Sequence, residues 1–493
     1  ADITKVDPWF LYQIQDIVGV EEAIRSKSLQ QMDRAFMLHV KQYGFSDIQI
    51  AYLVEDNVTE EEVRAYRKSL GLIPSFQVVD TCAGEFPAKT PYFYSTYATN
   101  NESQVSDRKK VVILGSGPNR IGQGIEFDYS CVHGVLAAKE MGYEAIMINC
   151  NPETVSTDFD VADKLYFEPV FWERVNDILE HEKPEGVIVQ LGGQTALKLA
   201  RDFEKNGITI FGTQFANMDM AEDRSQFSDI LKELKIPFPP YGAARSVQEA
   251  IDTAEEIGYP LLVRPSYVLG GQGMRIAINK EEVEKYVNQI WKLMPDNVIL
   301  LDLFLEDGIE LDVDAICDGD EVWVAGIMQH IEPAGVHSGD STAVLPPYSL
   351  SHEIQETVRE YMDAIGRRLG VLGLVNVQMV IKNDLVYVIE ANPRASRTVP
   401  FVAKATGVPI SNIATKVMLG AKIDEFRKRG ILESTLVGYA VKEPVFSWDK
   451  FPEVRKELGP EMKSTGEAIA FIADFKDEHF RKPFEMRNLY LSR

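Results

Sequence analysis

Hydrophobic and polar positions follow a helical pattern through the first part of the chain, up to about residue 107. Apolar residues recur at three- and four-residue spacing between Ile14 and Ile24, which is typical of an amphipathic helix. Thr59 and Glu62 have the spacing of a capping box, so a further helix is expected to begin there. The Pro- and Tyr-rich segment 84–97 is expected to be irregular. We therefore predict a helical domain without strands over residues 1–107.

The pattern then changes to short apolar runs separated by helical segments. Buried strands are predicted at 110–114, 144–149 and 186–191, and a short fourth strand at 209–211. Repeated strand–helix units form a parallel sheet with right-handed crossovers. Residues 108–228 are therefore predicted to form a Rossmann-like domain with a parallel sheet.

A third pattern, mixed α+β, begins near residue 229. Helices are expected at 226–234, 247–257 and 351–369. The predicted strands are 261–265, 274–278, 298–304, 310–317, 321–331, 374–381 and 385–390. Residues 229–493 are thus predicted to form one α+β domain, which makes the whole chain a multidomain protein of α/β and α+β class.

Composition and charge narrow the class of protein. A chain of 493 residues with 45% apolar residues accommodates two to four globular domains. The net charge of −24 argues against a nucleic-acid surface, and no run of about eighteen apolar residues marks a membrane span. Four scattered Cys residues without a CxxC motif, and no secretory signal, indicate a reducing, cytoplasmic compartment. The chain begins with Ala rather than Met, so we expect it to be processed or part of something longer.

The most informative segment is Val386–Arg397, a strand pattern that ends in polar side chains. A tight turn before it would place Gln378, on the preceding strand, beside Glu390. Oxygen donors from neighbouring strands suit a hard cation such as Mg²⁺. Arg394 and Arg397 suit a small planar oxyanion, because guanidinium binds carboxylates and phosphates in a forked geometry. Metal, phosphate and oxyanion ligands at one strand end are the requirements of phosphoryl transfer; a hairpin with a polar turn is the structural alternative.

A Gly-rich segment, Arg264–Met274, lies between two predicted strands. Gly270 and Gly271 would let the backbone approach phosphate oxygens closely, and Arg264 would add a positive charge. An ordinary Gly-rich hairpin is the alternative. The metal ligands downstream favour the phosphate interpretation, because ATP binds together with a cation.

Acidic residues alternate with apolar ones in the next predicted strand, so Glu310, Asp312 and Asp314 should share one face. Three carboxylates repel one another unless a cation or a sugar hydroxyl lies nearby. A ribose-binding role is favoured for Glu310, and a solvated strand face stays open for the other two. Further on, His337 lies in a polar, Gly-punctuated segment. It is either a buried structural residue or a hydrogen-bond donor to a transferring phosphoryl oxygen.

Loops with Gly and small polar residues follow strands of the predicted parallel sheet. Gly115–Gly124 invites a dinucleotide-binding interpretation, but Arg120 stands where the third Gly of GxGxxG belongs, and no acidic residue closes the next strand. A tight turn beside a substrate cleft is favoured instead. Asn151–Asp158 and Gln190–Thr195 also follow strands, and ligands bind at the carboxyl ends of such sheets.

Together these segments resemble the carbamoyl phosphate synthetase family, namely the second half of its large subunit, over nearly the full length. On this resemblance, residues 1–107 are its helical oligomerisation domain, 108–228 its pre-ATP-grasp (biotin carboxylase N-like) domain and 229–493 its ATP-grasp domain. The matching stretches are Asp7–Leu11, Asp80–Phe86, Leu114–Asp128, Asn149–Asp158, Arg264–Gly271, Ala334–Ser341 and Glu390–Arg397.

The resemblance implies an ATP-grasp ligase that phosphorylates carbamate with ATP, giving carbamoyl phosphate and ADP for arginine and pyrimidine biosynthesis. The implied cofactors are two Mg²⁺ or Mn²⁺ ions, and K⁺ is left open. The implied partners are the N-terminal synthetase half, the glutaminase small subunit and a second copy bound through residues 1–107. The implied site residues are Gln378, Glu390 and Asn392 at the metals, Arg224 and Arg264 at the ATP phosphates under a flap of Gly270 and Gly271, Leu303 and Leu305 near adenine, Glu310 at the ribose, His337 at the transferring phosphate, and Arg394 and Arg397 at carbamate.

Three departures from the family are expected to matter. The half that makes carbamate and the glutaminase are absent, so this chain should run only the last step or its reverse. The family's C-terminal allosteric domain is also absent, which puts regulation by nucleotides or ornithine in doubt. Gln272-Gly273 replaces an Arg-Ala type sequence after the Gly pair, so the motion of the flap is expected to differ.

Two other interpretations stay open. A biotin-dependent carboxylase subunit or an amino-acid ligase would share the Glu-x-Asn-x-Arg ending, although neither is expected to carry the oligomerisation domain. A non-catalytic scaffold, which keeps helical self-association without turnover, is the alternative outside the enzymes.

Overall fold

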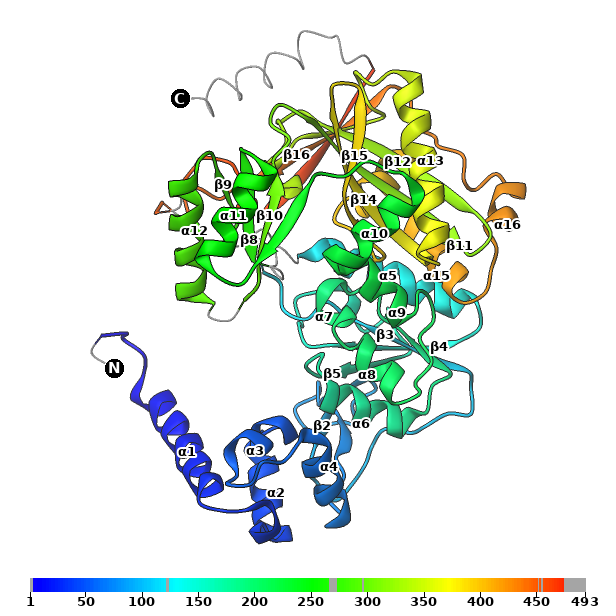
Figure 1. Cartoon of the computed structure of the whole chain (residues 1–493). Helices are drawn as coiled ribbons and strands as arrows, with labels where there is room; N and C mark the ends of the chain where they lie inside the picture. Colours follow the sequence, from blue (N-terminus) through cyan, green and yellow to red (C-terminus); the bar gives the residue numbers. More distant parts are fainter. Residues whose placement is uncertain are drawn as a thin grey trace.

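The computed structural model describes residues 3–120, 124–265, 273–294, 297–450, 452–453 and 455–473. The chain runs from a helical N-terminal part, through a mostly parallel sheet, to a C-terminal region with two antiparallel sheets (Figure 1). In the described part of the chain, no helix is both long and apolar enough to cross a membrane.

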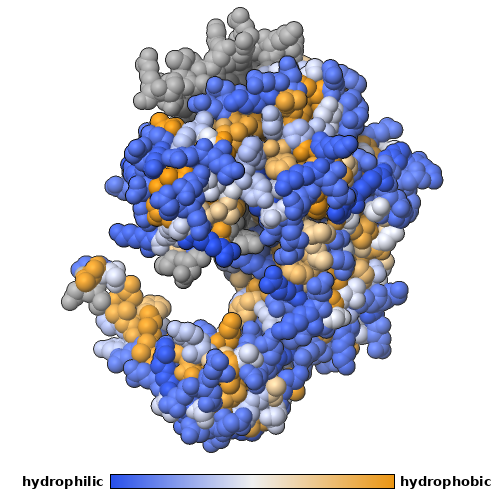
Figure 2. Space-filling model, viewed as in Figure 1, coloured by the Kyte–Doolittle hydropathy of each residue, from blue (hydrophilic) through white to orange (hydrophobic). Residues whose placement is uncertain are grey.

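The N-terminal part is helical up to Ser69. The predicted capping box is present, because the Thr59 N–H donates to Glu62 Oε2 at 2.7 Å and the Glu62 N–H donates to Thr59 Oγ1 at 3.3 Å. The first helix projects from the body of the molecule and exposes apolar side chains (Figures 1 and 2), with Trp9 59% and Ile14 56% exposed. The helices are α1 (Pro8–Arg25), α2 (Arg34–Gln42), α3 (Asp47–Leu53) and α4 (Glu60–Ser69).

The prediction of a strand-free stretch up to residue 107 is wrong for residues 75–96. Strands β1 (Ser75–Val78) and β2 (Tyr92–Thr96) pair with each other, and β2 pairs with β5 (Lys164–Phe167). They thereby extend the parallel sheet at its edge. Both strands are short, and pairing with a distant partner rather than local alternation of side chains decides their conformation.

The six-stranded sheet has the order β1-β2-β5-β4-β3-β6. The predicted strands β3 (Lys110–Leu114) and β4 (Glu144–Asn149) are confirmed and buried along their whole length. Strand β6 (Gly186–Ile188) is shorter than predicted, and the predicted fourth strand is only an isolated bridge between Val187 and Ile210. The helices around this sheet and after it are α5 (Ile125–Glu140), α6 (Trp172–Glu182), α7 (Gly193–Leu197), α8 (Ala200–Lys205), α9 (Phe215–Glu222) and α10 (Arg224–Leu234).

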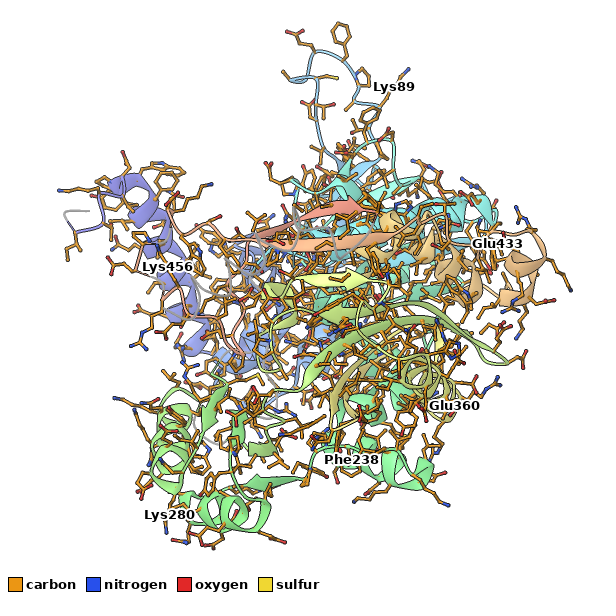
Figure 3. The ribbon with its side chains drawn as sticks, turned by 90° about the horizontal axis from the view of Figure 1, so that it is seen from above. Lys89, Phe238, Lys280, Glu360, Glu433 and Lys456 are labelled. Atoms are coloured by element: carbon orange, nitrogen blue, oxygen red, sulfur yellow. The ribbon has the colours of Figure 1, made fainter. Side chains whose placement is uncertain are left out.

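A four-stranded antiparallel sheet and two helices form a lobe, which contains Lys280 in Figure 3. The strands predicted at 261–265, 274–278 and 298–304 are confirmed with small shifts at their ends, whereas helix α12 was not predicted. Its elements are β7 (Tyr241–Ala244), β8 (Leu261–Pro265), β9 (Arg275–Ala277), β10 (Ile299–Leu303), α11 (Val247–Ile257) and α12 (Lys280–Leu293).

The seven-stranded antiparallel sheet has the order β15-β14-β11-β12-β13-β16-β17. Helix α15 packs against both β14 and α5, so one hydrophobic core continues from the parallel sheet into this sheet. Helix α13 packs on β11, β12 and β15, in a separate core. The elements are β11 (Ile309–Asp318), β12 (Val322–His330), β13 (Ala343–Leu345), α13 (His352–Arg368), β14 (Leu372–Lys382), β15 (Leu385–Asn392), α14 (Val399–Thr406), α15 (Ile410–Met418), α16 (Ile423–Lys428), β16 (Tyr439–Val445) and β17 (Gly466–Ile472).

Candidate active site

Strands β14 and β15 form a hairpin that carries the predicted metal ligands. Its turn residues Asn383 and Asp384 have positive φ angles of 53° and 60°, as a two-residue type I′ turn requires. Gln378 and Glu390 are direct register partners, which confirms the prediction that the hairpin brings them together. Asn392 donates from Nδ2 to Glu390 Oε1 at 2.9 Å. Two amides and one carboxylate therefore meet at one end of the hairpin.

A β-bulge directly follows this pair. The register shifts between Gln378 and Met379, so Ile389 has no partner in the β14 ladder. The carbonyl of Ile389 instead accepts a hydrogen bond from Nη1 of Arg224 at 2.8 Å. The bulge thereby joins an Arg residue predicted at the ATP phosphates to the hairpin predicted to hold the metal.

Asp302, on β10, links the two Arg residues predicted at the ATP phosphates. Its Oδ1 lies 2.7 Å from Nη2 of Arg224, and its Oδ2 accepts from Nε of Arg264 at 3.0 Å. Arg224 also lies over the ring of Tyr241, 4.9 Å from the ring centre. One carboxylate therefore holds two guanidinium groups beside each other. Asp302 was not among the predicted site residues, although it directly precedes Leu303, which was.

The three carboxylates of β11 are not on a solvated face, because Asp312 and Asp314 are only 2% and 1% exposed. His330 lies among them, with Nε2 3.0 Å from Asp312 Oδ2 and Nδ1 3.9 Å from Glu310 Oε1. Burial raises the pKa of Glu310 to about 7, and the neighbouring His330 offsets only part of this effect. Burial is the largest single effect on Asp312 and acts to raise its pKa, but the hydrogen bond and charge of His330, the hydrogen bond from Asn376 and the charge of Lys442 together lower that pKa below its usual value.

Asp314 fixes the segment that carries the second predicted carbamate-binding Arg. Its carboxylate accepts hydrogen bonds from Asn376 Nδ2 at 2.9 Å, Ser396 Oγ at 2.8 Å and Thr398 Oγ1 at 2.6 Å. Burial nonetheless raises the pKa of Asp314 to about 6. Since Ser396 and Thr398 flank Arg397, these bonds hold Arg397 in place against β11.

His337 and Arg397 are neighbours, although they lie far apart in the sequence. Nδ1 of His337 accepts from the Gly339 N–H at 3.0 Å and lies 3.4 Å from Nη1 of Arg397. Because Nδ1 is the acceptor, the hydrogen-bond pattern assigns the ring proton to Nε2. Burial, with the charge of Arg397, lowers the pKa of His337 well below its usual range. The ring is therefore neutral and able to donate one hydrogen bond.

Arg394 binds side chains from two domains. Its Nε donates to Gln194 Oε1 at 3.2 Å, and its Nη2 donates to Asn392 Oδ1 at 3.2 Å. Arg397 makes a comparable ion pair across the same boundary, with Nε 3.3 Å from Glu126 Oε1. Burial lowers the pKa of both guanidinium groups. Two cations withdrawn from water favour an anionic substrate between them.

The loops after the parallel strands pack directly against this segment. The Gln190 side chain donates to the Pro393 carbonyl at 2.8 Å, and the Ala395 N–H donates to the Gln190 carbonyl at 2.8 Å. Gly117, with a φ of 71°, donates from its N–H to Asn149 Oδ1 at 3.1 Å. A tight turn beside the predicted substrate cleft is thus present in the described residues of Gly115–Gly124.

The structure describes only some of the remaining predicted site residues. Gly270 and Gly271 lie outside the described residues. Leu305 is buried and Leu303 half-buried, and the Leu303 N–H donates to the Pro240 carbonyl at 2.8 Å. In the described ranges no group of three or more His, Cys, Asp and Glu side chains is placed to hold a metal ion. A magnesium site here would therefore depend on amide, carboxylate and substrate phosphate oxygens, a set that suits Mg²⁺.

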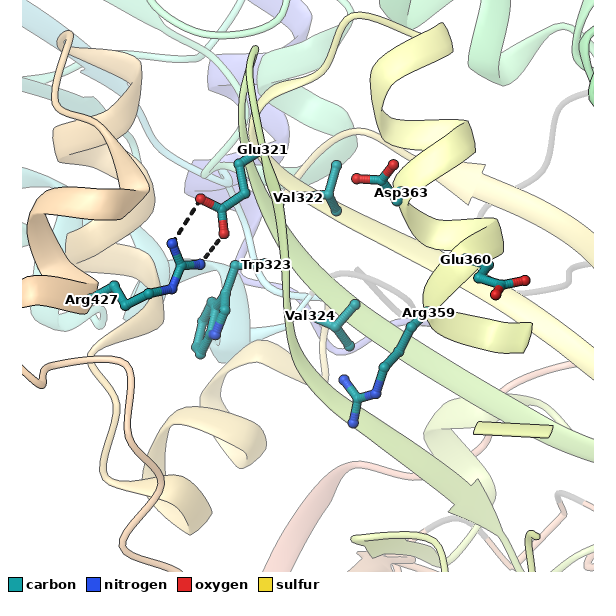
Figure 4. Close-up of a pocket in the computed structure, with 8 residues that line it drawn as sticks. All are labelled: Glu321, Val322, Trp323, Val324, Arg359, Glu360, Asp363 and Arg427. Carbon is teal, nitrogen blue, oxygen red and sulfur yellow. Dashed lines mark hydrogen bonds and ion pairs between the residues drawn. The ribbon is translucent and has the colours of Figure 1, made fainter. Parts of the chain in front are cut away.

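A surface cavity of about 640 Å³ lies elsewhere, between β12 and α13 (Figure 4). The ion pair between Glu321 and Arg427 bounds one side of it. Its other lining residues are Val322, Trp323, Val324, Arg359, Glu360 and Asp363. None of the predicted site residues lines this cavity, so it has no part in the chemistry considered below.

The β14–β15 hairpin, the half-buried Arg residues beside it and the adjoining lobe have the arrangement of an ATP-grasp fold. Comparison with family models agrees with this architecture. Residues 1–71 match the carbamoyl-phosphate synthetase large chain oligomerisation domain, 107–220 the carbamoyl phosphate synthase preATP-grasp domain, and 223–426 the carbamoyl-phosphate synthase L chain ATP binding domain. The chain belongs to the carbamoyl phosphate synthase large chain family.

Curated relatives show the same likeness over most of this chain. It is 52% identical over 479 residues to the carbamoyl phosphate synthase large chain of Archaeoglobus fulgidus, and 53% identical over 475 residues to that of Pasteurella multocida. Each match covers 96% of this chain but only 44% of the relative, so the chain spans less than half the length of these proteins.

Solved structures share the fold at low sequence identity. A biotin carboxylase domain of the Hydrogenobacter thermophilus 2-oxoglutarate carboxylase has a TM-score of 0.58 and 20% identity, covering 78% of this chain and 90% of its own. Biotin carboxylase from Campylobacter jejuni has a TM-score of 0.55 and 17% identity, covering 69% and 76%. Identities this low support the fold alone, whereas identity near one half places the chain with the synthases.

Proposed function

We propose that this chain phosphorylates carbamate with ATP, giving carbamoyl phosphate and ADP, as the second synthetase half of a carbamoyl phosphate synthase in arginine and pyrimidine biosynthesis. The observation that carries the proposal is a row of neighbouring residues at the end of the β14–β15 hairpin. Gln378 is the register partner of Glu390, Asn392 donates to Glu390, and Arg394 donates to Asn392. Oxygen ligands for a metal ion beside a half-buried guanidinium group suit the transfer of a phosphoryl group to a small anion.

The residues at the nucleotide have separate tasks in this proposal. Gln378 and Glu390 would hold a Mg²⁺ or Mn²⁺ ion, with Asn392 on a second, and the bound ions would neutralise charge on the ATP phosphates. Arg224 and Arg264, held together by Asp302, would bind phosphate oxygens. The remaining contacts follow the resemblance: Glu310 at the ribose, Leu303 and Leu305 near adenine, and the Gly270–Gly271 flap over the phosphates.

Arg394 and Arg397 would orient carbamate so that its oxygen attacks the γ-phosphorus in line. Carbamate is a weak nucleophile that decomposes in water, so positioning and exclusion of water must supply most of the rate enhancement. Neutral His337, with its proton on Nε2, would donate a hydrogen bond to a phosphoryl oxygen as negative charge redistributes. No covalent intermediate on the enzyme is required, because the phosphoryl group passes directly between the two substrates.

The assignment of partners and domains rests on the same resemblance. The N-terminal synthetase half and the glutaminase small subunit would supply carbamate, and residues 1–107 would bind a second copy. The exposed apolar side chains of α1 support an interface in that region. Domain limits of 1–107, 108–228 and 229–493 and a cytoplasmic location are parts of the proposal, and K⁺ is left open as a further ion.

The decisive experiment is the reverse reaction, formation of ATP from ADP and carbamoyl phosphate with Mg²⁺. The intact chain should be active, and Glu390→Ala should reduce turnover by at least about 100-fold, since it removes the only carboxylate among the described residues predicted to bind metal. Glu433→Ala, at an exposed position outside the predicted site residues, is the matched control. An intact chain that binds ADP without turnover would instead support the scaffold alternative.

A further inference from the structure

The segment between β16 and β17 includes residues that contact the proposed active site. Strands β16 and β17 pair from Tyr439 to Val445, so the chain leaves the sheet at Val445 and returns at Gly466. In between, residues Gly459–Ser464, here called the strap, contact the segment that carries His337. No sequence motif singled out this connection.

Asp340 anchors the strap. This carboxylate is fully buried, and it accepts from the Lys463 N–H at 2.8 Å and from the Ser464 N–H at 2.8 Å. The Ser464 hydroxyl donates to the Gly339 carbonyl at 2.9 Å. Charge-assisted bonds from backbone N–H groups hold a loop more firmly than neutral ones. The strap is therefore fixed on the segment His337–Asp340.

From this anchor the strap contacts two residues of the proposed site. They are His337, assigned to the transferring phosphoryl group, and Arg397, assigned to the carbamate that accepts it. The Gly459 carbonyl accepts from the His337 N–H at 2.8 Å. The thioether of Met462 accepts from Nη1 of Arg397, with a donor–sulfur distance of 2.9 Å. The same nitrogen lies 3.4 Å from Nδ1 of His337, so Met462 and His337 hold one arm of the guanidinium between them.

Gly339 makes this arrangement possible. A Cβ atom at this position would lie 2.8 Å from Cε of Met462 and 3.0 Å from Nη1 of Arg397. Such distances are shorter than ordinary van der Waals contacts, so a side chain here would displace one of the two residues. The absence of a side chain at Gly339 is what lets sulfur and guanidinium meet.

We propose that Met462 is a positioning residue for carbamate, acting through Arg397; this rests on the proposed function. A thioether is an uncharged, weak acceptor, so it orients the guanidinium without cancelling its positive charge. Glu126 already pairs with Nε of Arg397 at 3.3 Å, and a second carboxylate at the position of Met462 would compete with the anionic substrate for the other end of the guanidinium. The strap thus selects the orientation of Nη1 of Arg397 without adding a second countercharge beside carbamate or carbamoyl phosphate.

The test uses the intact chain and the reverse reaction, with Met462→Leu as the main variant. Leu keeps the volume but removes the acceptor, and KM for carbamoyl phosphate should rise roughly three- to tenfold, as expected for the loss of one modest hydrogen bond. KM for ADP should not change. Met462→Gln, which restores an oxygen acceptor, should recover most of the loss. Met141→Leu, at a 40% exposed position after α5, controls for the substitution itself.

A second variant tests the same contact from the opposite side. Gly339→Ala should raise KM for carbamoyl phosphate in the same direction, because the added methyl group displaces Met462 or Arg397. A merely structural role would instead lower the thermal midpoint and change both KM values together, without rescue by Met462→Gln. That result, or an unchanged KM for carbamoyl phosphate in Met462→Leu, would overturn the proposal.

Failure of the proposed function is distinguishable from failure of this inference. If the intact chain shows no turnover, the dissociation constant of carbamoyl phosphate in the presence of MgADP replaces KM, and the same three- to tenfold weakening in Met462→Leu is expected. If the intact chain binds no carbamoyl phosphate at all, the proposed function fails and the role of Met462 fails with it.

Discussion

Asp302 and Arg264 form an ion pair across two neighbouring strands of the lobe, with Oδ2 3.0 Å from Nε. The other oxygen of the same carboxylate lies 2.7 Å from Arg224, which comes from helix α10 outside the lobe. The Asp302 carboxylate therefore links the lobe to the helix beside the hairpin that is proposed to bind metal. Since both Arg residues are assigned to the ATP phosphates, Asp302 sets their spacing before nucleotide arrives.

Replacing Asp302 with Ala should weaken nucleotide binding. Without the carboxylate, two half-buried guanidinium groups repel each other and lose their orientation, so KM for ADP should rise about tenfold or more, consistent with the loss of charge-assisted hydrogen bonds. KM for carbamoyl phosphate should change little. Initial rates of ATP formation at varied ADP check this. A fall in KM for ADP would show that Asp302 competes with phosphate rather than positioning its ligands.

The pKa of Glu310 predicts a pH dependence of nucleotide binding. A carboxylate accepts hydrogen bonds from ribose hydroxyls better than a carboxylic acid, and burial raises this pKa to about 7. KM for ADP should therefore fall as pH rises from about 6 to about 8. Glu310→Gln should bind ADP more weakly and lose this dependence. An identical pH profile in the two proteins would exclude Glu310 as the source.

The raised pKa of Glu310 also predicts how the stability of the folded protein depends on pH. The folded protein holds the Glu310 proton up to about pH 7, whereas the unfolded chain releases it near 4.5. The stabilising contribution is therefore complete below the unfolded pKa and is lost as pH rises through the folded one. Glu310→Gln should flatten the decline in thermal midpoint over this window. Some slope should persist, because Asp314, with a pKa of about 6, acts in the same direction.

His337 should act as a neutral hydrogen-bond donor and not as an acid or base. Its pKa lies well below the usual range, so kcat should show no titration of this residue between about pH 6 and 8. His337→Ala should lower kcat by about 100-fold or more, the effect of removing one donor to a developing anion. KM for ADP should stay near its original value. An acid limb near the ordinary pKa of His that disappears in the variant would contradict the neutral ring.

Much of this site could be predicted from the sequence because its ligands lie in local patterns. The turn before Val386 has few possible geometries, so the pairing of Gln378 with Glu390 follows from the hairpin itself. The motif ending at Arg397 has several polar residues close together in the sequence. Its Glu and Asn side chains suit a metal ion, and its Arg side chains suit an oxyanion. The roles of Asp302, Glu126, Asp340 and Met462 could not be predicted, because each depends on contacts between segments distant in the chain.

The strands of the fold also differ in this way: local pattern predicts some of them, and others depend on contacts with distant segments. Strands β3 and β4 are apolar and central, so local pattern alone identifies them. Strands β1 and β2 lie at the sheet edge and alternate weakly, and their strand conformation depends on pairing: β2 pairs with β5, and β1 pairs with β2. The carboxylates of β11 were correctly placed on one face, but their burial depends on His330, Asn376 and the segment 396–398, which the pattern of the strand does not show.

A buried charge network joins the helical N-terminal part to the parallel-sheet domain, and its disruption should separate them. Lys41 Nζ lies 2.7 Å from Glu173 Oε1 and 2.9 Å from Asp47 Oδ1, and all three side chains are almost fully buried. Arg67 binds Asp47 from the other side at 2.7 Å. Since Glu173 belongs to α6 and the other three to α2, α3 and α4, the network crosses the boundary.

Glu173→Ala should lower the free energy of unfolding of the N-terminal part by about 3 kcal/mol, because it leaves the Lys41 charge buried and less well paired. Hydrogen exchange should show the loss first in α2 and α3, while amides of β14 and β15 keep their protection. Glu61→Ala, which removes an exposed ion pair with Lys205 on α8, should have almost no effect. Equal loss of protection in the β14–β15 hairpin would mean that the network stabilises the whole chain rather than this boundary.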